Sequence, residues 1–85
     1  MRLDKYLKIS RVIKRRSVAN EICSSGRVLK NGKPAKPGAD IQCGDVLEII
    51  FGNGITRIKV ISIQDFVRKE QAAEMYEILE GKEIE

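Results

Sequence analysis

The 85-residue sequence contains no histidine and no tryptophan, and only two cysteines, Cys23 and Cys43. A structural zinc site needs about four nitrogen or sulfur ligands, which this chain does not supply. Two cysteines in a chain without an export signal are typical of reduced, small apolar side chains, although the two could in principle pair. The acidic residues 40, 45 and 48 lack the ligand density and loop pattern of a calcium site. The sequence therefore predicts a protein with no metal and no cofactor.

Aromatic residues and long apolar runs are also scarce. The four aromatics, Tyr6, Phe51, Phe66 and Tyr76, all fall at core-like positions, so they do not predict a platform for stacking single-stranded bases. No segment approaches the roughly 18 consecutive apolar residues of a membrane span, and the opening MRLDKYLK has no apolar run of an export signal. These absences predict a cytoplasmic protein with no membrane contact.

The totals fit one small folded domain, because 42% of the residues are hydrophobic and 33% are charged. A chain of this length has a small core and no room for a catalytic domain. It also offers no convincing nucleophile and base pair. The sequence predicts a binding protein and not an enzyme.

Positive charge is abundant, and it is concentrated at the beginning of the chain. Residues 1–36 hold eleven Lys and Arg against Asp4 and Glu21, a net +9, whereas residues 37–85 hold five basic against ten acidic residues, a net −5. Solubility does not require nine excess charges in 36 residues, since self-repulsion destabilises a compact state. The split predicts a polyanionic ligand, with RNA as the first candidate.

Two short helices are expected first. The apolar residues of segments 2–9 and 16–25 each fall on one helical face. Ser17 is expected to cap the second helix, and Gly26 to end it in a left-handed conformation. In the connection between the helices, Val12 and Ile13 are expected to reach the core.

A small, mostly antiparallel sheet is expected next. Asn31-Gly32 is the strongest short signal for a type I′ hairpin, here between arms 28–30 and 33–35. Pro34 excludes a central strand, so the second arm is expected at an edge or as a very short strand. Turns at Pro37-Gly38 and Gly44-Asp45 precede a strand over 46–51. A turn at 52–54 leads to a second strand over 55–61.

A last helix is expected over about 68–80, introduced by Gln64 or Asp65. Ala72, Met75, Tyr76 and Leu79 form its apolar stripe, and Gly81 follows. Such a helix most often covers a sheet, although its acidic face could dock a protein partner.

The basic residues of the first half are the candidate RNA contacts. Arginine forks onto phosphate or stacks on a base, so the arginines are better candidates for placed contacts than the lysines. A helix start at Ser17 would present free backbone N–H groups to phosphate. Asn31 is expected to serve its turn first, and Asp4 to pair with a nearby cation or to start the first helix. For any single lysine, a purely solvated role and an RNA contact carry about equal weight. The predicted contacts are Arg2, Lys5, Arg11, Lys14, Arg15, Arg16, Ser17, Arg27, Lys30, Asn31, Lys33 and Lys36.

Four segments together carry a resemblance to a known domain: RLDKYL, ICSSGRV, VLKNGKPAKPG and CGDVLEI. They resemble the RNA-binding domain named after small-subunit ribosomal protein S-four, with its αL motif. The resemblance implies an α+β fold in which two N-terminal helices pack on a small sheet and a basic face grips structured RNA. Residues 1–50 would form the RNA-binding αL core and residues 51–85 a strand and C-terminal helix of the same single domain, 1–85.

The segment VRKEQAAEMYEIL extends the resemblance over nearly the whole chain, to the RqcP (YabO) family of bacterial ribosome-quality-control factors. The resemblance implies binding to large ribosomal subunits obstructed by peptidyl-tRNA, with contacts to large-subunit rRNA and P-site tRNA. It also implies support of C-terminal alanine tailing by a partner elongation protein. Arg2 and Arg16 are the leading contact positions, and the chain is expected to be monomeric off the ribosome.

Alternatives remain from the sequence alone. The nearest is a heat-shock-type factor that recycles stalled large subunits; that relative carries a long basic C-terminal extension, whereas this chain reads EGKEIE at its end. A general structured-RNA-binding protein is a second alternative. A protein adaptor acting through the acidic last helix is a third, and it leaves the +9 half unexplained.

Overall fold

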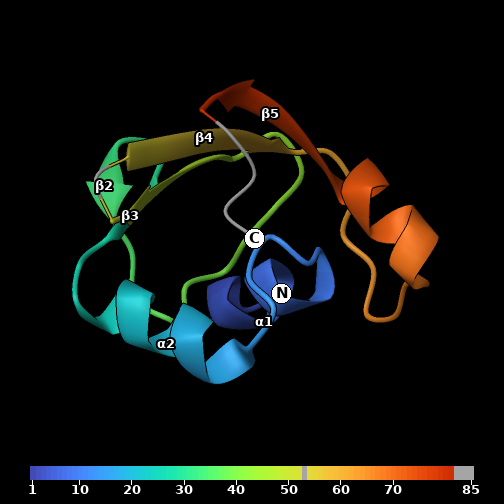
Figure 1. Cartoon of the computed structure of the whole chain (residues 1–85), viewed down its shortest axis with the longest axis horizontal. Coiled ribbons are helices and arrows are strands. Elements are labelled where there is room, and N and C mark those ends of the chain that lie inside the picture. Colours follow the sequence, from blue (N-terminus) through green and yellow to red (C-terminus); the bar gives the residue numbers. More distant parts are fainter. Residues whose placement is uncertain (53, 82–85) are drawn as a thin grey trace.

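The computed structural model describes residues 1–52 and 54–81, and it has the predicted α+β fold (Figure 1). Two helices lie on one side of a five-stranded antiparallel sheet of order β2-β1-β3-β4-β5. The elements are α1 (Leu3–Ile9), α2 (Arg16–Ser24), β1 (Val28–Lys30), β2 (Lys33–Pro34), β3 (Val46–Phe51), β4 (Gly54–Val60), the 3-10 helix η1 (Lys69–Met75) and β5 (Tyr76–Glu80). No helix in the described part of the chain has the length and apolar character needed to cross a membrane.

The predicted helix pair is confirmed, but its cap is different. The second helix begins at Arg16 after an extended Arg15, and no side chain caps that start. Ser17 therefore lies inside the first turn, and the prediction that it caps α2 is wrong, because the helix begins two residues earlier than a cap at Ser17 requires. Gly26, with φ of 80°, follows α2 in the left-handed conformation that was expected of it.

The hairpin between β1 and β2 is confirmed. Asn31 and Gly32 have φ of 51° and 87°, the positive pair that a type I′ turn requires. Strand β2 contains only Lys33–Pro34 and lies at the edge of the sheet, where a proline breaks no central ladder.

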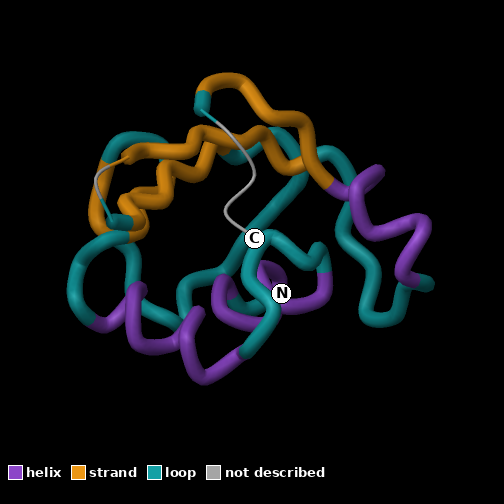
Figure 2. The backbone as a smooth tube through the Cα atoms, viewed as in Figure 1, coloured by secondary structure: helices purple, strands orange, loops and turns teal. Residues whose placement is uncertain are grey.

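The core lies between the helix pair and one face of the sheet (Figure 2). Leu47 pairs with Ile58 across β3 and β4, and both are fully buried, whereas Glu48 and Arg57 of the next pair face away from the core. Val12 and Ile13 are buried, as predicted. The Tyr6 hydroxyl donates to the Met75 carbonyl oxygen at 2.7 Å, which ties α1 to η1.

The predicted helix over 68–80 is wrong in its second half. The chain forms only the 3-10 helix η1, preceded by Arg68 and not by residue 64 or 65, and residues 76–80 form strand β5. Pairing with β4, including Ile58 with Ile78, satisfies backbone groups that would otherwise leave that sheet edge open. Leu79 is 45% exposed at the register shift and not part of a buried stripe.

Gly81 follows β5 with φ of 87°. A Cβ at this position would collide with the backbone carbonyl oxygen of Ile55, so the close approach requires glycine. The predicted turn at 52–54 includes Asn53, which lies outside the described residues.

Two of the four aromatic residues are not in the core. Phe66 is 88% exposed in the loop between β4 and η1, and Phe51 is 40% exposed at the end of β3, where it pairs with Gly54. Tyr6 is fully buried and Tyr76 is half-buried.

Candidate nucleic-acid interface

Asp4 joins the two leading arginines. Its carboxylate accepts a hydrogen bond from Arg2 Nε at 3.1 Å, and Arg16 Nε lies 3.5 Å from its other oxygen. Asn20 Nδ2 donates to the same carboxylate at 3.2 Å, and the backbone N–H of Lys5 donates at 2.8 Å. One carboxylate from α1 therefore holds two guanidinium groups on the same surface, one from the residue that precedes α1 and one from the first residue of α2.

The Asp4 carboxylate is buried while its partners are not. Its side chain is 3% exposed, whereas those of Arg2 and Arg16 are 54% and 48% exposed. Burial raises the pKa of Asp4, but hydrogen bonds from Arg2, Asn20 and Arg16, with the charge of Arg16, outweigh it and leave the pKa below its ordinary value. Two cations share one anion, so an outward-facing positive charge remains.

Backbone and charge contacts connect this pair to the hairpin. Leu3 N–H donates to Ala39 O at 2.9 Å, and the amino terminus lies 2.9 Å from the Asp40 carboxylate. Lys30 Nζ donates to the Asp40 carbonyl oxygen at 3.0 Å. The start of α1, the loop around residue 40 and the hairpin therefore form one continuous surface.

The hairpin contributes a shallow basic pocket of about 420 Å³ to that surface. Lys30, Lys33 and Lys36 line it, together with Pro34, Ala35 and Ala39. Three lysines at one pocket suit phosphate backbone contacts that do not need a fixed geometry.

The other predicted contacts are placed differently. Arg15 and Ser17 are exposed at the start of α2, and Arg27 is exposed just after Gly26. Lys5 is engaged with Asp65 at 3.3 Å. Asn31 uses its side chain within the fold: its amide donates to Asp45 at 3.1 Å, and its carbonyl oxygen accepts the Val46 N–H at 2.9 Å. The expectation that Asn31 serves the turn first is confirmed.

Arg11 and Lys14 lie apart from the Asp4 cluster. They line a pocket of about 240 Å³ between the loop after α1 and η1. Sequence reasoning placed both on the RNA surface but did not bring them to η1.

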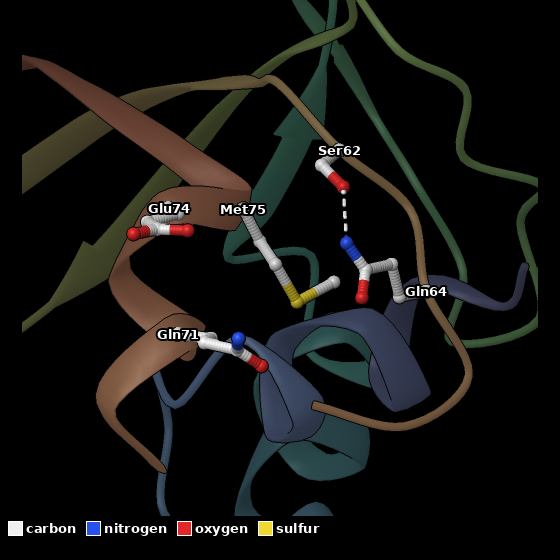
Figure 3. Close-up of a pocket in the computed structure, with 5 residues that line it drawn as sticks. All are labelled: Ser62, Gln64, Gln71, Glu74 and Met75. Atoms are coloured by element: carbon white, nitrogen blue, oxygen red, sulfur yellow. Dashed lines mark hydrogen bonds between the residues drawn. The ribbon is translucent and has the colours of Figure 1, made fainter. Parts of the chain in front are cut away.

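A third pocket, of about 150 Å³, lies between η1 and the loop that follows β4 (Figure 3). Its lining residues are Ser62, Gln64, Gln71, Glu74 and Met75. Gln64 Nε2 donates to Ser62 Oγ at 3.1 Å, and the Met75 thioether extends between the polar groups. The single charged residue of this lining is an acid, so the pocket does not suit a phosphate.

The outward face of the sheet carries the opposite charge arrangement. Arg57 lies between Glu48 and Glu80, at 3.3 Å from each carboxylate. There one cation is shared by two anions, and the local charge is negative.

The sequence did not predict that Asp4 and Asn20 act together in the candidate site. Asp4 was predicted to partner a cation, which is confirmed, but its role for both helices depends on packing. The signal available was spacing: residues 16 and 20 lie one helical turn apart and so share a face of α2. In the described residues, no three potential metal ligands of the His, Cys, Asp or Glu type gather.

Comparison with known proteins shows the family of this chain. Residues 1–47 match the family model described as S4 domain. A Streptococcus pneumoniae protein named RQC P-site tRNA stabilizing factor is 49% identical over 85 residues, which cover 100% of this chain and 97% of the relative. A protein of the same name from Listeria innocua is 53% identical over 79 residues, covering 93% and 86%.

The fold is also similar to a solved structure, described as a trimeric structure of Vibrio cholerae Heat Shock Protein 15. The TM-score is 0.84 at 32% identity, and the match covers 92% of this chain and 80% of that one. The chain belongs to the S4-domain family and, within it, to the group of proteins named RQC P-site tRNA stabilizing factor.

Proposed function

We propose that this protein is a non-catalytic RNA-binding factor of ribosome-associated quality control. It binds large ribosomal subunits obstructed by peptidyl-tRNA, contacts rRNA and the P-site tRNA together, and supports C-terminal alanine tailing by a partner elongation protein. The observation that carries the proposal is the Asp4-held pair Arg2 and Arg16, in a chain whose relatives are named for stabilising P-site tRNA.

The mechanism is bridging. Each arginine side chain keeps about half of its surface accessible, so each can fork onto a phosphate while Asp4 fixes its position. Because Arg2 precedes α1 and Arg16 begins α2, the two arginines can engage phosphates of two strands or of two molecules. Holding rRNA and tRNA on one rigid surface lowers the entropic cost of retaining the tRNA.

The test is purification of the tagged chain from cells whose ribosomes are stalled. The proposal predicts free large subunits that carry tRNA, and a loss of both particle and tailed products in Arg2→Ala and Arg16→Ala. Lys59→Ala is the matched control, since it removes an exposed cation from the opposite sheet face. Unchanged recovery and tailing in folded Arg2→Ala and Arg16→Ala would refute the bridging role.

A second candidate follows from the likeness to Heat Shock Protein 15. A recycling factor of that type would act on stalled large subunits without supporting tailing. Subunit recovery with no dependence of alanine tailing on this chain would favour it. Although the Vibrio cholerae structure is described as trimeric, we expect this chain to be monomeric off the ribosome, which sedimentation would measure.

A further inference from the structure

The pocket between the loop after α1 and η1 has the composition of an anion site. Arg11 and Lys14 line it from the loop, and Lys69 lines it from the first residue of η1. Ser10, Ala72, Ala73 and Tyr76 complete the lining. Among the described residues that line it there are three cations and no carboxylate, so the pocket attracts a negative group.

Two of these cations are not engaged elsewhere in the described part of the chain. Arg11 and Lys69 form no ion pair with any residue in 1–52 or 54–81, unlike Arg2, Arg16 and Lys5. A ligand phosphate would therefore gain their charge without breaking an internal ion pair. The pocket of about 240 Å³ is large enough to admit a phosphate group with its ester oxygens.

The backbone at Arg11 supports a role for its side chain. Arg11 follows α1 with φ of 62°, the left-handed conformation in which glycine or asparagine is favoured. The other helix-ending position of this kind, after α2, is Gly26. An arginine at a position that favours glycine indicates a use beyond ending the helix.

We propose that Arg11, Lys14 and Lys69 form a second phosphate-binding site, which takes a backbone phosphate of the RNA bound by the Asp4-centred surface. This inference rests on the proposed function. It adds a contact from η1, in the acidic half of the chain, to an interface otherwise built from the first 36 residues.

The experiment is binding of isolated large subunits carrying P-site tRNA, measured over a salt series for the wild type, Lys69→Gln and Arg68→Gln. Arg68 is the exposed cation next to Lys69 and does not line the pocket. We expect Lys69→Gln to weaken binding by about threefold to tenfold and to lower the salt slope by about one, and Arg68→Gln to leave both unchanged. Equal behaviour of the two variants would overturn the inference.

Arg11→Gly separates binding from folding. Glycine relieves the left-handed strain, so the melting temperature should be equal or higher while subunit affinity falls to the same extent as in Lys69→Gln. Wild-type affinity in Arg11→Gly would overturn the site. Arg16→Ala, measured in parallel, distinguishes the two proposals: if Arg16→Ala weakens binding and the pocket variants do not, only the second site fails.

Discussion

The helix face and the sheet face of this molecule share their charges in opposite ways. On the helix face, one buried carboxylate, Asp4, is shared by two arginines with half-exposed side chains, and a positive charge is left over. On the sheet face, one guanidinium, Arg57, is shared by two carboxylates, and a negative charge is left over. The difference shows that the positive surface is not merely a surplus of lysine and arginine but includes two cations held in fixed positions by a buried anion.

The largest expected contrast between the two halves is in thiol reactivity. Burial, and secondly the charge of Asp4, raise the pKa of Cys23 to about 11, whereas Cys43 is exposed. At pH 8 Cys43 should react with iodoacetamide, while Cys23 should react at least a hundredfold more slowly because it requires opening of the helix pair. Mass spectrometry of time points would measure this. Equal labelling rates would mean that the helix face is not packed as described.

Asp4→Ala should be the most damaging single change on the helix face. It leaves Asn20 and two guanidinium groups without their shared acceptor, and we expect a loss of about 1–3 kcal/mol in the free energy of unfolding. Subunit affinity should fall with it, since Arg2 and Arg16 lose their positions. Urea denaturation measures the first effect, with Glu48→Ala as the matched carboxylate on the sheet face. A loss no larger than that of Glu48→Ala would remove the distinction between the faces.

Acid should weaken the helix face through the same carboxylate. The pKa of Asp4 is lowered in the folded protein, so its contribution to stability is complete above the unfolded pKa of about 4 and is lost as the pH falls through the folded value. The wild type should therefore lose more of its free energy of unfolding than Asp4→Asn between pH 5 and pH 2. Parallel stability curves for the two proteins would contradict the assignment.

The sheet-face cluster should have the smallest effect. Its three side chains are partly exposed, and solvent screens such pairs, so Glu80→Gln should change the free energy of unfolding by less than about 0.5 kcal/mol. Subunit binding should not change. Weaker subunit binding in Glu80→Gln would place the sheet face in the interface.

Most of the fold could be predicted from local sequence signals. The helix pair, the turn at Asn31-Gly32 and the strand over 46–51 depend on neighbouring residues, and each was predictable from periodicity or turn chemistry. The end of the chain was not, because the apolar residues Ala72, Met75 and Tyr76 suit a helix while pairing with β4 favours a strand. That competition is decided by tertiary contacts, which a single sequence does not display.

The candidate site was predictable in composition but not in arrangement. Arginines 2 and 16 stood out by type and position, yet their shared partner depends on how α1 packs on α2. Likewise Lys69 is separated by more than 50 residues from Arg11 and Lys14, and only the fold brings them to one pocket. The sequence shows which residues are charged, whereas the packing of the elements determines where those charges lie.

The most direct test of the account is the salt dependence of binding to large subunits carrying P-site tRNA. Arg16→Ala should lower the slope of log affinity against log salt concentration by about one, because one phosphate contact is lost, while Arg57→Ala should leave the slope unchanged. Identical slopes for Arg16→Ala and the wild type, in folded protein, would contradict the claim that the Asp4-held arginines grip the RNA.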